Sequence, residues 1–220
     1  MSGRPSAGDA RRTRFATTSY VALEGPCCAG KTTLARALVD CLADLAVCSV
    51  PCYADHVGGG RFLPPPVPIS LGEDQAGLRA LLMIENDRLA GPRAGQYDVA
   101  LLDRSVHTLL AHRYAIDQLT GLGCYESATT TVSLSPAPAW PSLVIFLDVS
   151  QGAVEQRNRG KFPADSLFID ARFNSAIRSY YDSVTASGDA PIVWLDGELD
   201  SGKLIDQAET QIRALLRRPD

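Results

Sequence analysis

Short apolar runs alternate with amphipathic stretches along most of this chain. Five of the runs are rich in branched aliphatic and aromatic residues, which is typical of buried strands. They cover residues 20–24, 47–53, 98–103, 141–149 and 191–196. Because helical stretches separate them, the pattern predicts an α/β fold of three layers, a five-stranded parallel sheet with helices on both faces.

The amphipathic stretches predict the covering helices, as where Leu34, Leu38 and Leu42 recur at helical spacing after the first run. Residues 54–71 are rich in glycine and proline, which predicts a long loop beyond the carboxyl end of the second strand, where open α/β sheets bind ligands. Residues 124–138 are only weakly patterned and predict no clear element. Helices are expected over residues 33–42, 73–89, 106–118, 166–187 and 201–217.

Residues 25–32 read G-x-x-x-x-G-K-T, between the first strand and the first helix. Glycine at both ends lets the backbone wrap a phosphate, and the helix start adds the positive end of its dipole. Lys31 can reach the outer phosphates, and the Thr32 hydroxyl can ligate Mg²⁺. We therefore predict an ATP and Mg²⁺ site, with the nucleotide contacted by Gly25, Cys28, Ala29, Gly30, Lys31, Thr32 and Thr33.

Further charged residues follow the later strands. Asp103 ends the strand over residues 98–103, the position of a Walker-B aspartate, so Thr32 and Asp103 are the expected metal ligands. Arg104 comes directly after it, and Arg157, Arg159 and Lys161 form a charged loop beyond the fourth strand. Phosphoryl transfer requires such charge neutralisation more than it requires covalent help.

Composition limits the function classes. The 220 residues are 45% hydrophobic and 21% charged, which fits one globular domain over residues 19–220. A net charge of −4 argues against a nucleic-acid polymer as partner, and no apolar run is long enough to span a membrane. Six cysteines without zinc spacing favour reduced thiols in a cytoplasmic protein. Residues 1–18 lack an apolar segment and are expected to be a disordered leader.

Four local motifs resemble the thymidylate kinase and deoxynucleoside kinase branch of P-loop kinases. The resemblance covers nearly the whole chain and implies the three-layer P-loop kinase fold. It is carried by residues 23–25 with 30–33, residues 81–88, residues 102–111, and residues 141–149 followed by Arg157 and Arg159.

The resemblance implies roles for the charged residues and an ATP-dependent phosphotransferase. Residues 157–166 would be a lid that closes over ATP and excludes water, so that Arg157 and Arg159 act with Lys31 and Arg104 in catalysis. Arg88 and Arg104 would hold a small-molecule acceptor. Related kinases often form dimers through helices that flank the acceptor site, so a homodimer is also expected.

The chain departs from thymidylate kinases where the acceptor would bind. Ile84 replaces an aromatic residue that stacks on the base, and His112 and Arg113 replace a tyrosine and a glutamine. Residues 55–58 read Asp-His-Val-Gly in place of Glu-Pro-Gly-Gly. We therefore expect Asp55, Arg88, His112 and Arg113 to select the acceptor. The same departures argue against recognition of a thymine base.

The role expected of Asp55 depends on the chemical nature of the acceptor. If the acceptor is a hydroxyl, a carboxylate at this strand end serves as general base; if it is a phosphate, arginine clamps suffice. The preferred hypothesis is a kinase acting on a nucleoside- or nucleotide-like acceptor. One alternative is a phosphotransferase for a hydroxyl of a specialised metabolite or antibiotic, and another is a nucleotide-binding module without catalysis.

Overall fold

The computed structural model describes residues 18–93, 97–136 and 138–217, so the predicted leader lies outside the described residues except for Thr18. Its centre is a five-stranded, all-parallel sheet with the strand order β2-β3-β1-β4-β5. The strands are β1 (Ser19–Glu24), β2 (Val47–Val50), β3 (Val99–Asp103), β4 (Leu143–Asp148) and β5 (Ile192–Asp196). The predicted three-layer α/β fold is confirmed.

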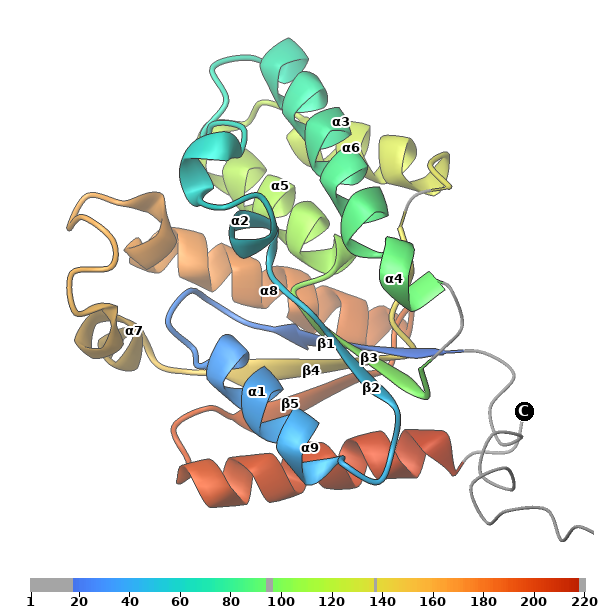
Figure 1. Cartoon of the computed structure of the whole chain (residues 1–220). Coiled ribbons are helices and arrows are strands. Elements are labelled where there is room, and N and C mark those ends of the chain that lie inside the picture. Colours follow the sequence, from blue (N-terminus) through green and yellow to red (C-terminus); the bar gives the residue numbers. More distant parts are fainter. Residues whose placement is uncertain (1–17, 94–96, 137, 218–220) are drawn as a thin grey trace, which may run out of the picture.

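Helices cover both faces of the sheet (Figure 1). Because side chains alternate along a strand, Val21 and Leu23 pack on one face while Ala22 packs on the other. The first face is covered by α1 (Lys31–Cys41) and α9 (Ser201–Leu216). The second is covered by α3 (Leu71–Arg88), α5 (Val106–Thr120), α6 (Cys124–Ser133) and α8 (Ala171–Ser187). A strand buried on both faces explains why the runs are apolar throughout.

Strand β2 ends earlier than predicted, at Val50 rather than at residue 53. Pro51 has no backbone N–H to continue the ladder with β3. The chain turns instead into the short helix α2 (Tyr53–His56), which begins at the last residue of the predicted strand. The 3₁₀ turn η1 (Gly60–Phe62) follows inside the predicted loop. Helix α2 places Tyr53 in the core and leaves Asp55 exposed.

Helix α6 occupies part of the weakly patterned segment and was not predicted. Cys124, Ala128 and Val132 form a buried stripe at i, i+4 spacing, and the Asp117 carboxylate accepts hydrogen bonds from the N–H groups of Cys124 and Tyr125 at 2.7 and 2.8 Å. Three consecutive threonines lower the helix propensity of the segment. Packing and capping, which a local pattern does not report, outweigh that propensity.

The predicted helix over residues 166–187 begins later than expected. A 3₁₀ turn, η2 (Leu167–Ile169), comes first, and the Asp170 carboxylate then caps α8 by accepting from the N–H groups of Arg172 and Phe173.

Helix α7 (Gln151–Asn158) precedes the charged loop, and α4 (Ala90–Arg93) follows α3. No helix in the described part of the chain is both long and apolar enough to cross a membrane.

The register of the sheet brings distant residues together at its carboxyl edge. Leu23 of β1 lies opposite Asp103 of β3, and Glu24 lies opposite Phe146 of β4. The loop after β1 and the turn after β3 therefore leave the sheet side by side. Any site built from them lies at the edge where parallel sheets bind ligands.

Candidate active site

The loop between β1 and α1 is shaped by its glycines. Gly25 has φ +132°, and a Cβ there would lie 2.6 Å from the Leu147 carbonyl oxygen, so only glycine fits where β1 passes β4. Gly30 has φ +99° at the start of α1. The Lys31 ammonium is buried and donates to the carbonyl oxygens of Gly25 and Pro26 at 3.0 and 2.6 Å. The lysine thus links the start of the loop to the start of α1.

Lys31 should make nucleotide binding depend on pH. Burial, with a smaller contribution from nearby Arg104, lowers the pKa of Lys31 to about 8. Below that pH the side chain is charged and attracts phosphate; above it the free protein must take up a proton to bind. We expect the dissociation constant for Mg²⁺-ATP to rise as pH rises through about 8, by up to about tenfold per pH unit.

Calorimetric titration between pH 7 and 9.5 measures this slope. Lys31→Arg is the matched control because a guanidinium stays charged over this range, so its profile should be flat whatever its absolute affinity. A flat profile in the unmodified protein would contradict the prediction.

The predicted metal ligands lie next to each other. The Thr32 hydroxyl donates to Asp103 Oδ2 at 2.5 Å, and the Asp103 side chain is 3% exposed. A hydroxyl and a carboxylate oxygen suit Mg²⁺, which takes hard oxygen ligands and keeps several waters or phosphate oxygens. The residues therefore fit the ion predicted from the sequence.

The turn after β3 presents Arg104 in an unusual backbone conformation. Arg104 has φ +73°, which is uncommon outside glycine, and its N–H donates to the Leu23 carbonyl oxygen at 3.1 Å. Its guanidinium reaches the Gly25 carbonyl oxygen at 3.5 Å and Cys27 Sγ at 3.4 Å. Burial opposes its charge, but Cys27, Glu24 and Asp103 together raise the pKa of Arg104, so it is a permanent cation at the phosphate loop.

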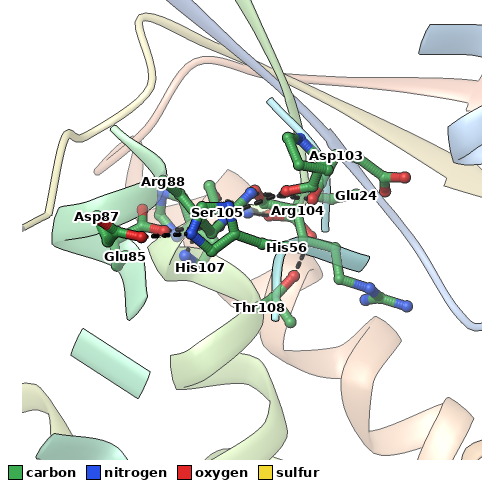
Figure 2. A network of polar contacts seen from close by, with 11 residues as sticks. Glu24, His56, Glu85, Asp87, Arg88, Asp103, Arg104, Ser105, His107 and Thr108 are labelled. Atoms are coloured by element: carbon green, nitrogen blue, oxygen red, sulfur yellow. Dashed lines mark hydrogen bonds and ion pairs between the residues drawn. The ribbon is translucent and has the colours of Figure 1, made fainter. Parts of the chain in front are cut away.

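Glu24 holds this turn in place. Its side chain is fully buried and accepts from the Ser105 N–H at 2.8 Å, the Ser105 hydroxyl at 2.7 Å and the Thr108 hydroxyl at 2.5 Å. Figure 2 shows Glu24, Ser105 and Thr108 joined in one network beside Asp103 and Arg104. Glu24 thus connects the end of β1 to the start of α5 and fixes the direction in which Arg104 leaves the sheet.

Glu24→Ala should lower both stability and activity. The substitution leaves the buried N–H and hydroxyl of Ser105 without an acceptor, which we expect to reduce the free energy of unfolding by about 2–4 kcal/mol. Urea unfolding measures this loss. Ser105→Ala is the graded control, because it keeps the backbone bond to Glu24 and should cost only about 1 kcal/mol. Equal stability of Glu24→Ala and the unmodified protein would exclude this role.

Arg88 is buried at the junction of three elements. It donates to the Pro51 carbonyl oxygen at 2.9 Å, to Glu85 Oε2 at 2.6 Å and to the carbonyl oxygens of Asp103 and Arg104 at 3.2 and 3.0 Å. Its guanidinium also lies 4.1 Å from the centre of the Tyr53 ring. These contacts join α3 to the ends of β2 and β3 and favour a positioning role. Direct contact between Arg88 and an acceptor stays a prediction.

Asp55 is exposed on α2, which follows β2 at the carboxyl edge of the sheet, the same edge at which the phosphate loop follows β1. Next to Asp55, His56 Nε2 lies 2.7 Å from Asp87 Oδ2 of α3 (Figure 2). This contact links α2 to α3, and contact between Asp55 and an acceptor stays a prediction.

His112 and Arg113 lie on α5, beyond Arg104. Burial, reinforced by the charges of Arg113 and Arg104, lowers the pKa of His112 to about 3, so His112 is neutral and packs edge-on against Phe173. Arg113 is 4% exposed and pairs with Asp74 of α3, with Arg113 Nε and Asp74 Oδ1 3.2 Å apart. The structure therefore gives Arg113 an internal partner and makes His112 a neutral group; their contacts with an acceptor stay predictions.

The predicted lid begins at the end of α7. Arg157 donates to the Ala29 carbonyl oxygen of the phosphate loop at 3.4 Å and to the Gly197 carbonyl oxygen after β5 at 3.0 Å. Arg159 and Lys161 are exposed, and Arg159 has φ +43°. Arg157 thus already contacts the phosphate loop, whereas Arg159 and Lys161 are exposed and Lys161 lies over the Phe162 ring.

Four residues of the site were not singled out from the sequence: Glu24, Tyr53, Asp74 and Glu85. Each is buried, and each has its partner far along the chain except Glu85, which pairs with Arg88 at i, i+3. That spacing is a local signal that could have identified Glu85. Glu24 and Asp74 carry none, because a glutamate at a strand end and an aspartate near a helix start are ordinary residues at such positions. Tyr53 carries none either, because its partner Arg88 lies on α3.

Comparisons with known proteins bear on the fold. A scan against protein-family models and a search of curated proteins found no match. Solved structures do match: a deoxyadenosine kinase from M. mycoides, described with products dCMP and a flexible dCDP bound, is 15% identical with a TM-score of 0.63. The same kinase with bound dATP is 16% identical with a TM-score of 0.60, and in both cases the match covers 89% of this chain and 99% of that chain. The chain has the P-loop deoxynucleoside kinase fold.

Proposed function

We propose that this protein is an ATP-dependent kinase that transfers the γ-phosphoryl group to a nucleoside-type acceptor, in the first place to a hydroxyl. The observation that carries the proposal is the assembly at the carboxyl edge of β1 and β3. There Lys31, the Thr32–Asp103 pair and Arg104 converge on one glycine loop. A binding module without catalysis requires the loop but not the additional arginines.

In the proposed mechanism the cationic side chains bind the phosphates and the carboxylates bind the metal ion or accept a proton. The N–H groups of the phosphate loop and Lys31 hold the phosphates of ATP, and Arg104 and Arg157 neutralise charge on the group in transfer. Thr32 and Asp103 would hold Mg²⁺, which would supply positive charge against the phosphates. Asp55 accepts the proton of the acceptor hydroxyl as its oxygen bonds to the γ-phosphorus and the bond to the leaving ADP oxygen breaks.

A panel of acceptors tests the proposal. ADP release is measured with Mg²⁺-ATP alone and with deoxynucleosides, ribonucleosides, nucleoside monophosphates and hydroxylated metabolites including aminoglycosides. We expect deoxynucleosides to raise ADP release above background, and mass spectrometry of the product should show one added phosphoryl group. Stimulation by the metabolites alone would support the alternative phosphotransferase.

If no acceptor raises ADP release while Mg²⁺-ATP still binds, the kinase proposal is wrong and a nucleotide-binding module remains. A homodimer is proposed separately, from the resemblance to related kinases. Light scattering of the full chain tests it, and a monomer mass at micromolar concentration would exclude it.

A further inference from the structure

Two adjacent thiols lie inside the phosphate loop. Cys27 and Cys28 are both partly exposed, and Cys28 has φ +63°, one of three non-glycine residues with positive φ in the described part of the chain. Cys27 Sγ lies 3.4 Å from Arg104 Nη2. Phosphate binding requires only the backbone at these two positions, so the side chains have no assigned task.

The surroundings of these sulfurs are cationic. Lys31, Arg104 and Lys161 all act electrostatically on Cys28, and Cys27 in turn acts on Lys31 and Arg104. Of these cations, Lys31 and Arg104 are the ones that we assign to the phosphates of ATP. An anionic reagent is therefore drawn to the thiols by the same field that draws the nucleotide.

The two thiols are not equivalent. Burial, and then the neighbouring Cys27, raise the pKa of the Cys28 thiol, which disfavours the nucleophilic thiolate at Cys28. Cys27 has the guanidinium of Arg104 as a direct partner. An attacking thiolate at Cys27 and a negatively charged reagent would both have a cation within reach.

We infer that Cys27 is a site of reversible mixed-disulfide formation with small anionic disulfides, and that this modification blocks phosphate binding in the same loop. The inference rests on the proposed nucleotide site. The Cys27 thiolate attacks one sulfur of the reagent, a new S–S bond forms, and the reagent's own S–S bond breaks. The released thiolate takes a proton from water, and excess thiol reverses the exchange.

Modification of Cys27 blocks phosphate binding through both the volume and the charge of the attached group. A group attached to Cys27 lies beside the Arg104 guanidinium and inside the loop that must wrap the phosphates. The carboxylates of the attached group would form ion pairs with Arg104, Lys31 and Lys161. Bound Mg²⁺-ATP should, conversely, shield the thiol from the reagent.

The test uses the full chain without any acceptor. The protein is treated with oxidised glutathione, which is net negative, or with cystamine, which is a dication, and peptide mapping by mass spectrometry follows each cysteine. Cys41 on α1 is exposed and serves as the internal reference. The preference for glutathione over cystamine should be about tenfold greater at Cys27 than at Cys41 and should decrease as salt is added.

Mg²⁺-ATP should slow the reaction of Cys27 and leave that of Cys41 unchanged. Protein modified at Cys27 should bind Mg²⁺-ATP at least about tenfold more weakly, since the loss of one phosphate-binding cation alone has an effect of that size. Dithiothreitol should restore binding. In Cys27→Ser the dissociation constant should no longer respond to oxidised glutathione, whereas in Cys28→Ser the response should persist.

The inference is overturned if Cys27 shows no greater preference for the anionic reagent than Cys41, if Mg²⁺-ATP gives no protection, or if the modified protein binds Mg²⁺-ATP normally. Labelling and nucleotide binding are read without an acceptor. A failure of the proposed kinase activity therefore leaves this test intact. Absence of any Mg²⁺-ATP binding before treatment would instead overturn the nucleotide site itself.

Discussion

Lys31→Ala should eliminate measurable phosphoryl transfer, with a loss in kcat of about 10³-fold or more. The lysine is 6% exposed, and its ammonium lies on the carbonyl oxygens of Gly25 and Pro26, at the centre of the loop that would receive the phosphates. Alanine leaves the backbone N–H groups to bind phosphate but removes the cation that stabilises charge on the transferred group. The measurement is kcat from product formation at saturating Mg²⁺-ATP.

Lys203→Ala is the control, since Lys203 is an exposed lysine of α9 to which we assign no role in the site. It should retain full activity. Circular dichroism and thermal unfolding of Lys31→Ala should resemble those of the unmodified protein, which separates a catalytic loss from misfolding. Activity of Lys31→Ala within tenfold of normal would remove Lys31 from the mechanism.

Asp55→Asn should reduce kcat by about 10²–10⁴-fold when the acceptor is a hydroxyl. The amide has nearly the shape of the carboxylate but accepts no proton, so the acceptor oxygen must attack while still protonated. With a nucleoside monophosphate as acceptor, the same substitution should have little effect, because the attacking oxygen is already anionic. Comparing the two acceptors on one variant therefore separates the mechanisms.

Asp87→Asn is the matched control. The Asp87 side chain is 77% exposed and pairs with His56, next to Asp55, so the variant removes a nearby negative charge without removing the proposed base. We expect its kcat to stay within about threefold of normal, as for other exposed charges. If Asp55→Asn behaves like Asp87→Asn with a hydroxyl acceptor, Asp55 is not the base.

The glycine loop of the proposed nucleotide site could be predicted from the sequence because its residues are adjacent in the chain. One stretch of eight residues encodes the glycines, the lysine and the hydroxyl, and the adjoining apolar pattern places them between a strand and a helix. Asp103 was also predictable, since it ends a buried strand. The structure adds the 2.5 Å contact between Thr32 and Asp103, which depends on β1 and β3 being neighbours.

The surroundings of the proposed acceptor residues could not be predicted in the same way, because these residues come from three separate helices, α2, α3 and α5. Arg88 and Arg113 were expected to offer free charges to a substrate. In the structure each has a buried internal partner, Glu85 and Asp74 respectively. A sequence shows that an arginine lies on a helix, but only packing decides whether a carboxylate from the same or another element meets it.

The sequence by itself therefore determined the α/β order, the phosphate loop and its cations, since each rests on a short local pattern. Tertiary structure alone decided the strand order, the existence of α6, and the buried contacts of Glu24 that direct Arg104. Those features depend on contacts between residues far apart in the chain. Their free energy comes from burial and from satisfied hydrogen bonds, neither of which exists until the sheet and helices have packed.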